Sequence, residues 1–312
     1  MDFVINEKAR DALNRLAAMP GMAEVKDQIE QMIQYRRIAE LRKQNRLKTR
    51  PQSNHMVFTG NPGTGKTTAA RLIGKAFIEI GLLKRSKEEV PFVEVNQSMI
   101  AAPHVGESER AINAKFKEAR GGVLFIDEAY SFIGKSDHRT DAKVIAAMVQ
   151  LIEDMRDEIV VIAAGYPKNM AEFLSFNPGL ASRFPTTIHF PDYDVPELIR
   201  IAQQMLQEQE YQPAPDYLEA LASALWIEKS RPGFGNARTV RNHVERSIRR
   251  QAIRVSQLPQ PSRKDLATLT AQDLVVSPQG LAGSEREALN KIIRDAQGRL
   301  LELDLKAIIS AI

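Results

Sequence analysis

The chain has 312 residues, a formal net charge of +4 and no cysteine. This length allows one large domain and a smaller one, and the missing cysteines exclude disulfides, thiolate metal sites and a cysteine nucleophile. The sequence has no apolar run of about 18 residues, and "MDFVINEKAR" at the start lacks the features of a targeting segment. We therefore expect a soluble, cytoplasmic protein without membrane insertion.

The first segment, residues 6 to 50, predicts helices that are interrupted at "MPGM" (19–22). Val25, Ile29, Met32 and Ile33 share one apolar face. A basic run then spans residues 36 to 50, and its helical spacing favours a solvated face over a nucleic-acid contact. Its members are Arg36, Arg37, Arg42, Lys43, Arg46, Lys48 and Arg50.

Five short runs rich in β-forming residues follow, each separated from the next by a helical pattern. They are "MVFT" (56–59), "FVEV" (92–95), "VLFI" (123–126), "IVVIAA" (159–164) and "TIHF" (187–190). Nearly continuous apolar strands that alternate with helices are typical of a parallel sheet covered on both faces. From about Pro196 the pattern becomes wholly helical, so an α/β domain precedes a small all-α domain.

Four regions result: a helical segment at 1–53, the α/β domain at 54–194, the helical domain at 195–275 and a tail at 276–312. In the tail, Leu289, Ile292, Ile293 and Leu300 have helical spacing, whereas "LLELDL" (300–305) alternates like a strand. Both interpretations of the tail stay open.

A glycine-rich stretch, "GNPGTGKTT" (60–68), follows the strand "MVFT" and precedes the helical pattern "AARLIGKAF". It matches GxxxxGK[ST], a phosphate-binding P-loop in which backbone N–H groups and a helix N-terminus face phosphate oxygens. Lys66 would neutralise the β- and γ-phosphates, and the Thr67 hydroxyl would bind Mg²⁺. The predicted nucleotide-binding residues are Gly60, Asn61, Pro62, Gly63, Thr64, Gly65, Lys66, Thr67 and Thr68.

Two carboxylates, Asp127 and Glu128, follow the buried strand in "GGVLFIDEAY" (121–130). Asp127 would complete the Mg²⁺ shell, and Glu128 would polarise a water for attack on the γ-phosphate. Beside a P-loop, this pair favours Mg²⁺-dependent hydrolysis of ATP to ADP and phosphate over nucleotide binding alone.

Five motifs in this order resemble an AAA+ ATPase over roughly residues 17 to 275: "GNPGTGKT", "GGVLFIDEA", "VVIAAGY", "NPGLASRF" and "GNARTVRN". More narrowly, "GGVLFIDEAY" and "GNAR" resemble the group of stage V sporulation protein K and the CbbX-type Rubisco activases. The resemblance implies a P-loop NTPase sheet of AAA+ type, followed by a helical lid domain.

The resemblance also implies roles for residues outside the P-loop. Arg183 would be an arginine finger that reaches the γ-phosphate of a neighbouring subunit, and Arg238 would be the sensor-2 arginine of the lid, with Arg241 as the alternative. Met22 lies in the segment that flanks adenine. At the sensor-1 position, where relatives across the superfamily have asparagine, stands Tyr166, with Asn169 as the second candidate.

The stretch "AAPHVGES" (101–108) falls where the family carries pore loop 1, usually aromatic, apolar, glycine. Counting back without gaps from "GGVLFIDE" puts His104, Val105 and Gly106 at these positions, so the resemblance implies that a histidine replaces the aromatic residue that grips a polypeptide. An imidazole is smaller and can carry charge near neutral pH. The alternative is that His104 is an ordinary exposed loop residue.

We therefore predict a chaperone-like protein remodeller that acts as a homo-oligomeric ring, expected to be a hexamer, and pulls a client polypeptide through its pore. A nucleic-acid-coupled AAA+ motor or loader is the alternative, motivated by the basic run and by the arginines of "RNHVERSIRRQAIR" (241–254). A third hypothesis is an assembly scaffold that hydrolysis resets. Relatives serve Rubisco activation, sporulation and secretion, and the residues do not choose among these clients.

Overall fold

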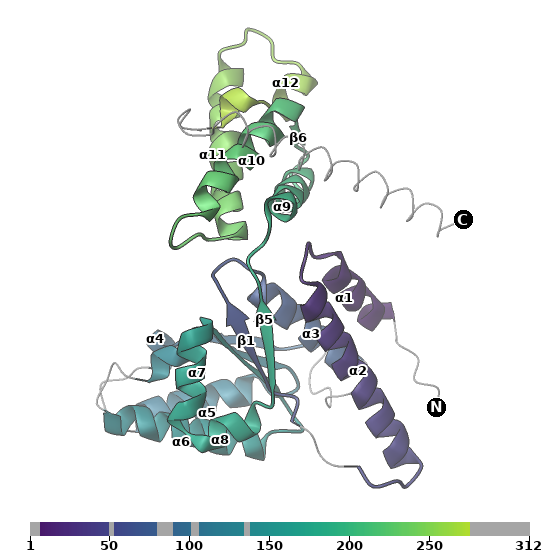
Figure 1. Ribbon diagram of the computed structural model, residues 1–312, viewed down its shortest axis with the longest axis vertical. Coiled ribbons are helices and arrows are strands. Elements are labelled where there is room, and N and C mark those ends of the chain that lie inside the picture. The colour runs from purple at the N-terminus through teal and green to yellow at the C-terminus, as the bar shows by residue number, and fades with distance from the viewer. Residues whose placement is uncertain (1–6, 50–52, 80–89, 101–105, 134–137, 275–312) are drawn as a thin grey trace. The chain divides into compact units, whose positions relative to one another are not determined.

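The computed structural model describes residues 7–49, 53–79, 90–100, 106–133 and 138–274 (Figure 1). The chain forms two compact units. The first contains residues 1–61 and 65–191, and the second contains residues 62–64 and 192–312. Three residues of the glycine-rich stretch thus belong with the second unit. The predicted tail at 276–312 lies outside the described residues.

The first unit alternates strands and helices as the sequence predicted. Its elements are α1 (Glu7–Ala18), α2 (Ala23–Gln44), β1 (Met56–Gly60), α3 (Lys66–Glu79), β2 (Phe92–Val95), α4 (Gln97–Ile100), α5 (Glu107–Glu118), β3 (Val123–Ile126), the 3-10 turn η1 (Ala129–Phe132), α6 (His138–Asp154), β4 (Val160–Gly165), α7 (Pro167–Phe176), α8 (Pro178–Arg183) and β5 (Thr186–Phe190).

The five strands form one parallel sheet in the order β2-β3-β4-β1-β5. All residues of β1, β3 and β4 are buried, which explains why these strands read as continuous apolar runs. Each predicted strand is present, and its bounds differ from the prediction by at most one residue. The parallel α/β fold is therefore confirmed.

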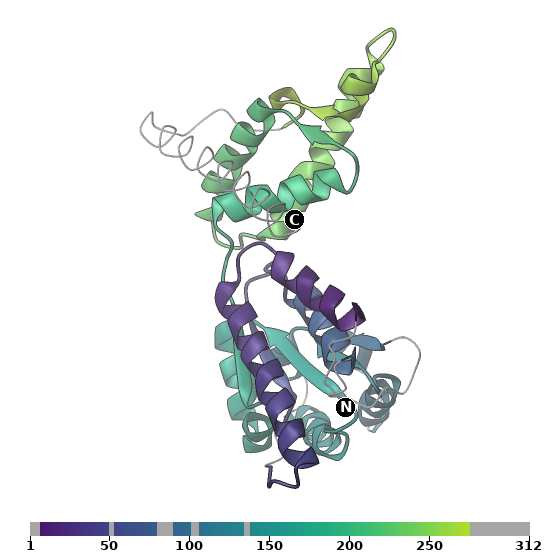
Figure 2. The same cartoon turned by 90° about the vertical axis from the view of Figure 1, so that its right-hand side faces the viewer.

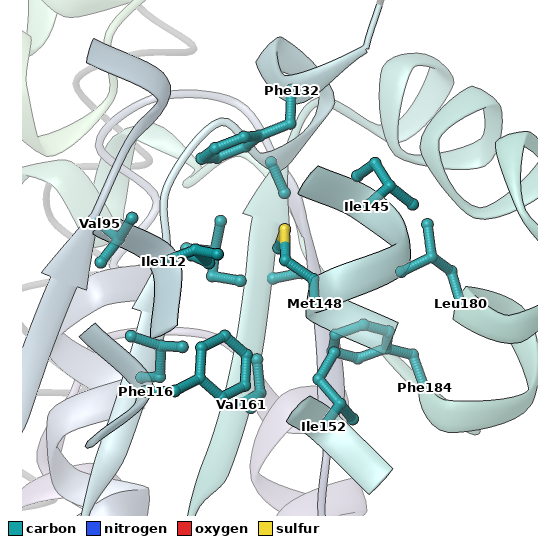
Figure 3. Packing of buried hydrophobic residues seen from close by; sticks show 14 of the residues in the cluster. Val95, Ile112, Phe116, Phe132, Ile145, Met148, Ile152, Val161, Leu180 and Phe184 are labelled. Atoms are coloured by element: carbon teal, nitrogen blue, oxygen red, sulfur yellow. The ribbon is translucent and has the colours of Figure 1, made fainter. Parts of the chain in front are cut away.

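One face of the sheet is covered by α5, α6, α7 and α8 (Figure 1). Figure 3 shows Val161 of β4 facing Phe116 of α5 and Met148 of α6, with Leu180 and Phe184 closing the cluster beside α6. These side chains are at most 3% exposed. Burying one such apolar side chain contributes about 1.5–3 kcal/mol relative to leaving it exposed, so this layer fixes the strand ends that carry the polar residues.

The opposite face is covered by α3, which contacts β1, β3 and β4 and is itself covered by α1 (Figure 2). Helix α2 contacts β5 and directs Val25, Ile29 and Ile33 inward, as its predicted apolar face requires. The interruption between α1 and α2 is also present. There Gly21 and Met22 adopt left-handed backbone conformations with φ of 63° and 60°, which end one helix before the next begins.

The second unit is mainly helical. Its elements are α9 (Val195–Gln207), β6 (Gln212–Pro213), α10 (Pro215–Lys229), α11 (Ala237–Ser256), α12 (Arg263–Ala267), β7 (Thr268–Leu269) and the 3-10 turn η2 (Ala271–Asp273). The parallel pair β6–β7 was not predicted, because two residues are too few to form a pattern. Arg254 of α11 donates to both carboxylate oxygens of the buried Asp273 at 2.8 and 2.9 Å, which ties α11 to η2.

Candidate nucleotide-binding site

The candidate site begins at the edge of the sheet where parallel strands end. The strand β1 lies between β4 and β5, with Thr59 paired to Gly165 and Gly60 paired to Phe190. Ile126 at the end of β3 pairs with Ala163 of β4. The glycine-rich stretch, Tyr166 and Asp127 therefore leave three adjacent strands at one edge, the usual ligand edge of such sheets.

The backbone of the glycine-rich stretch uses conformations that favour glycine. Gly60, Gly63 and Gly65 have φ of 150°, 72° and 90°. A Cβ atom at Gly60 would lie 2.3 Å from the carbonyl oxygen of Phe190, so a side chain there would clash with β5. The helix α3 then starts at Lys66, and its first N–H groups lack helical partners and suit an anion.

Polar groups suited to a nucleoside triphosphate and Mg²⁺ follow on α3. The Lys66 ammonium donates to the carbonyl oxygens of Gly60 (2.9 Å) and Asn61 (2.7 Å), which holds the cation across the start of the loop. Thr67 is half-buried and Thr68 is exposed. A cation, a helix N-terminus and a hydroxyl fit phosphate and Mg²⁺, and the assignment of Thr67 to the metal stays a prediction.

The two carboxylates at the end of β3 differ in setting. Asp127 is half-buried, its N–H donates to Val95 of β2 at 2.9 Å, and its Oδ1 accepts from the N–H of Glu128 at 3.1 Å. Glu128 is exposed and has a φ of 49°, a left-handed conformation that is costly outside glycine. The turn thus presents one anchored and one accessible carboxylate, which fits a metal ligand beside a base.

Sequence reasoning missed Tyr130, which follows this turn in "DEAY". The pKa of Tyr130 is raised to about 12, mainly by burial. The negative charge of Glu128, the neighbouring Tyr166 and a hydrogen bond to Glu128 raise it further. Tyr130 is therefore a protonated donor to Glu128 near neutral pH. Its ring lies 6.0 Å from that of Tyr166, centroid to centroid, and a Cβ at Gly165 would meet it at 2.7 Å. Its position next to the predicted base was the available signal.

Both sensor-1 candidates lie at the start of α7. Tyr166 precedes the helix and is 36% exposed, whereas Asn169 lies in its first turn and is half-buried. Tyr166 is the one that contacts the Tyr130 ring, and the choice between the two stays a prediction.

Arg183, the predicted arginine finger, ends α8 just before β5 begins. Its carbonyl accepts from the Ser53 hydroxyl at 2.7 Å, and its guanidinium contacts Ser182 at 2.9 Å and Glu153 at 3.7 Å. The Arg183 Nε atom is buried and has no hydrogen-bond partner among the described residues. Arg183 thus lies where β1 and β5 begin, whereas the glycine-rich stretch follows the other end of β1.

The second unit contains the predicted sensor-2 candidates. Arg238 is the second residue of α11 and is exposed, and Arg241, one turn later, is also exposed. The neighbouring Asn236 is fully buried and hydrogen bonds to Pro62, and the buried Tyr193 hydrogen bonds to Thr64. The sequence predicted a role for the arginine of "GNAR" and gave none to Asn236 or Tyr193.

Other predicted site residues are not brought to the candidate site by any described contact. Met22 precedes α2, is 6% exposed and keeps its adenine-flanking role as a prediction. His104 and Val105 lie outside the described residues. Gly106 precedes α5 with a φ of 85°.

A parallel sheet with a glycine-rich loop between its interior strand β1 and the helix α3, together with a carboxylate pair at the end of β3, defines a P-loop nucleotide-binding protein. Residues 56–192 match the family described as "ATPase family associated with various cellular activities (AAA)", and residues 194–284 match the AAA lid domain. The chain belongs to this AAA ATPase family.

Three relatives illustrate the membership. The chain is 39% identical to stage V sporulation protein K of Bacillus subtilis over 267 residues, 85% of this chain and 82% of that protein. It is 36% identical to the chloroplastic ribulose bisphosphate carboxylase/oxygenase activase of Cyanidioschyzon merolae over 261 residues, 82% and 87% of the two chains. It is 35% identical to protein CbbX of Cereibacter sphaeroides over 294 residues, 92% and 93%. Among the residues described in the structure, no helix has the length and apolarity to cross a bilayer.

Proposed function

We propose that this chain hydrolyses ATP with Mg²⁺ and acts in a closed ring of six copies that pulls a client polypeptide through a central pore. The observation that carries the ring is the place of Arg183. It adjoins Ser53, before β1 begins, whereas the glycine-rich stretch follows the end of β1. Five residues of strand span about 16 Å, too far for an arginine side chain to bridge.

An arginine that cannot reach its own γ-phosphate can act on that of a neighbour. Because a guanidinium stabilises the charge that develops in phosphoryl transfer, turnover would then require assembly. The Arg183 Nε has no hydrogen-bond partner among the described residues and the ion pair with Glu153 is long at 3.7 Å, although Nη1 donates to Ser182 at 2.9 Å. These contacts support a guanidinium that is only partly held in the single chain. Activity per subunit should therefore rise with protein concentration.

The hydrolytic roles follow from the strand-end groups. Mg²⁺ would supply charge neutralisation on the phosphates, and Thr67 with Asp127 would hold it. Lys66 would bind the β- and γ-phosphate oxygens instead of the loop carbonyls that it now contacts. Glu128 would accept a proton from the attacking water, and Tyr130 would position that carboxylate through its hydrogen bond.

The client is proposed to be a protein, because one relative is named an activase of an enzyme. His104, Val105 and Gly106 would grip an extended segment by packing, without reading its sequence. Arg238 would contact phosphate from the lid. The domain bounds 54–194 and 195–275 are proposed for the two parts of this machine.

The experiment measures steady-state ATP hydrolysis by the chain alone, with an unstructured polypeptide, and with single- or double-stranded DNA. We expect the polypeptide to stimulate hydrolysis, and His104→Ala to lose that stimulation while keeping the basal rate. His104→Phe is the matched variant, and it should retain the stimulation because it restores bulk. Stimulation by DNA that is indifferent to both variants would contradict the proposal and favour a nucleic-acid-coupled motor.

A further inference from the structure

Three consecutive backbone carbonyls of the glycine-rich stretch accept hydrogen bonds within the second unit. The carbonyl oxygens of Pro62–Thr64 accept hydrogen bonds from three different kinds of donor: a side-chain amide, a backbone N–H and a phenol hydroxyl. The bonds are Asn236 Nδ2 to Pro62 O at 3.3 Å, Ala237 N to Gly63 O at 3.2 Å and Tyr193 Oη to Thr64 O at 3.1 Å. The Ala237 N–H belongs to the first residue of α11.

The donors are held firmly. Asn236 is 0% exposed and has a φ of 49°. Its Oδ1 accepts from the N–H of Tyr193 at 3.0 Å, and its Nδ2 also donates to Asp192 at 2.7 Å. This positive φ, combined with a ψ of −126°, is a sparsely populated backbone conformation that costs a non-glycine residue on the order of 1 kcal/mol or more, so the surrounding bonds must impose it.

Tyr193 is also fixed and stays a donor. Its ring is 3% exposed, and the Lys229 ammonium donates to its carbonyl oxygen at 2.7 Å. Burial, and secondly the negative charge of Glu197, raise the pKa of Tyr193 to about 12. The hydroxyl therefore keeps its proton at any physiological pH and can serve Thr64 throughout.

Close packing accompanies these bonds. A Cβ atom at Gly63 would lie 2.1 Å from the carbonyl oxygen of Gly235 and 2.9 Å from the backbone nitrogen of Arg238. The loop backbone thus touches the start of α11 with no room for a side chain.

A peptide unit is planar, and its N–H and C=O point in opposite directions. The planes that carry the three bonded carbonyls also carry the N–H groups of Gly63, Thr64 and Gly65. These N–H groups are among those expected to face phosphate. If a phosphate group binds or leaves one of these N–H groups, the peptide plane can rotate. The carbonyl oxygen of the same plane then moves, and the side chain or N–H group that donates to it must move as well.

We propose that Tyr193 and Asn236 are positioning residues that transmit the nucleotide state from the backbone of Pro62–Thr64 to helix α11. This route uses backbone carbonyls, and it is separate from any contact that the Arg238 side chain makes with phosphate. The inference rests on the proposed nucleotide site, but on neither the ring nor hydrolysis.

The experiment uses the absence of cysteine in the sequence. Cysteines that replace the exposed residues Glu172 on α7 and Arg250 on α11 would carry spin labels. The distance distribution is measured with ADP and with a non-hydrolysable ATP analogue, at a protein concentration where the chain is monomeric. The unvaried protein should give two different distributions.

Tyr193→Phe removes the bond to Thr64 and keeps the ring, and Asn236→Gly removes the amide where glycine tolerates the backbone conformation. We expect both variants to bind nucleotide, with about 3- to 10-fold lower affinity for the loss of one or two bonds, and to give the same distribution with either nucleotide. Tyr217→Phe is the matched control. It removes a buried hydroxyl of α10 that makes no hydrogen bond to Pro62–Thr64, and it should behave like the unvaried protein.

Two results would overturn the inference. One is a nucleotide-dependent distance change in Tyr193→Phe and Asn236→Gly that equals that of the unvaried protein. The other is an unvaried protein that binds both nucleotides without any distance change. Failure of the proposed ring or of hydrolysis would leave these distances unaffected, and failure of the nucleotide site would appear as lost binding of a fluorescent ADP analogue.

Discussion

At the scale of single residues, Asp127 and Glu128 show how two neighbouring carboxylates can have settings that suit different tasks. Asp127 is held by backbone hydrogen bonds at the end of β3, whereas Glu128 is exposed on a left-handed turn and contacts Tyr130. A metal ligand needs a fixed oxygen, and a base needs access to water.

Glu128→Gln should therefore abolish turnover and spare binding. We expect kcat for ATP hydrolysis to fall by about 10²–10⁴-fold, the usual contribution of a general base. The affinity for ATP should change little, because the amide keeps the shape of the carboxylate. Steady-state hydrolysis and titration with a fluorescent ATP analogue measure the two quantities. A variant that stops hydrolysis yet still remodels a client would favour the scaffold hypothesis.

Tyr193 gives a second residue-scale prediction, through pH. Its pKa is raised from 10.0 to about 12 in the folded chain. The unfolded chain releases this proton first as pH rises, so the stabilising contribution is complete below pH 10 and is lost between pH 10 and 12. Two pKa units correspond to about 2–3 kcal/mol in the free energy of unfolding.

The measurement compares urea unfolding of the unvaried chain and of Tyr193→Phe from about pH 9 to pH 12. Relative to Tyr193→Phe, the free energy of unfolding of the unvaried chain should fall by about 2–3 kcal/mol over this range. Tyr35→Phe, which removes a hydroxyl from a side chain that is 52% exposed on α2, is the control for the substitution itself. A difference for Tyr193→Phe that stays constant over this range would refute the assignment.

At the scale of elements, two glycines with similar φ angles allow the cost of the backbone conformation to be measured apart from the cost of a close contact. Gly63 has a φ of 72° and closely contacts Gly235 and Arg238, whereas Gly233 has a φ of 80° and no atom of the described residues within 4 Å of an added Cβ. Gly233→Ala should cost about 1 kcal/mol for the left-handed conformation alone.

Gly63→Ala should cost a further ~1–3 kcal/mol, because either the loop or the start of α11 must move. Its affinity for nucleotide should fall by more than about tenfold, equivalent to 1.4 kcal/mol. Denaturant unfolding and nucleotide titration test both variants. Equal losses in the two variants would show that the contact with α11 contributes nothing.

The elements also show what sequence patterns can and cannot predict. Strands β1, β3 and β4 were predictable because a strand buried on both faces is a continuous apolar run, and β2 and β5 because their β-forming residues alternate between buried and more exposed positions. The glycine-rich stretch was predictable because its chemistry is local to nine residues. The pair β6–β7 was too short to form a pattern. Tyr193 lies 129 residues from Thr64 along the chain, and no local signal connects them. The contacts of Tyr130 with the Tyr166 ring and with Glu128 depend on the folded turn, so the sequence did not indicate them.

At the scale of the whole molecule, the chain is a AAA ATPase with a helical lid, and the proposed function adds that it works as a ring. The sequence suggested Arg183 only through the family resemblance. The structure supplies a physical reason, because the register of β1 and β5 separates Arg183 from the glycine-rich stretch by the length of a strand.

The most direct measurement mixes two inactive variants. Arg183→Ala has an intact Glu128 and lacks the finger, whereas Glu128→Gln has the finger and lacks the base. If Arg183 acts on the neighbouring subunit, an interface is active when the site belongs to Arg183→Ala and the arginine belongs to Glu128→Gln. In an equimolar mixture about a quarter of the interfaces have this arrangement, so the mixture should regain up to about a quarter of the activity of the unvaried protein. Arg183→Lys is the matched variant for the loss of the planar guanidinium. A mixture as inactive as its components, under conditions where the two variants assemble together, would contradict the ring account.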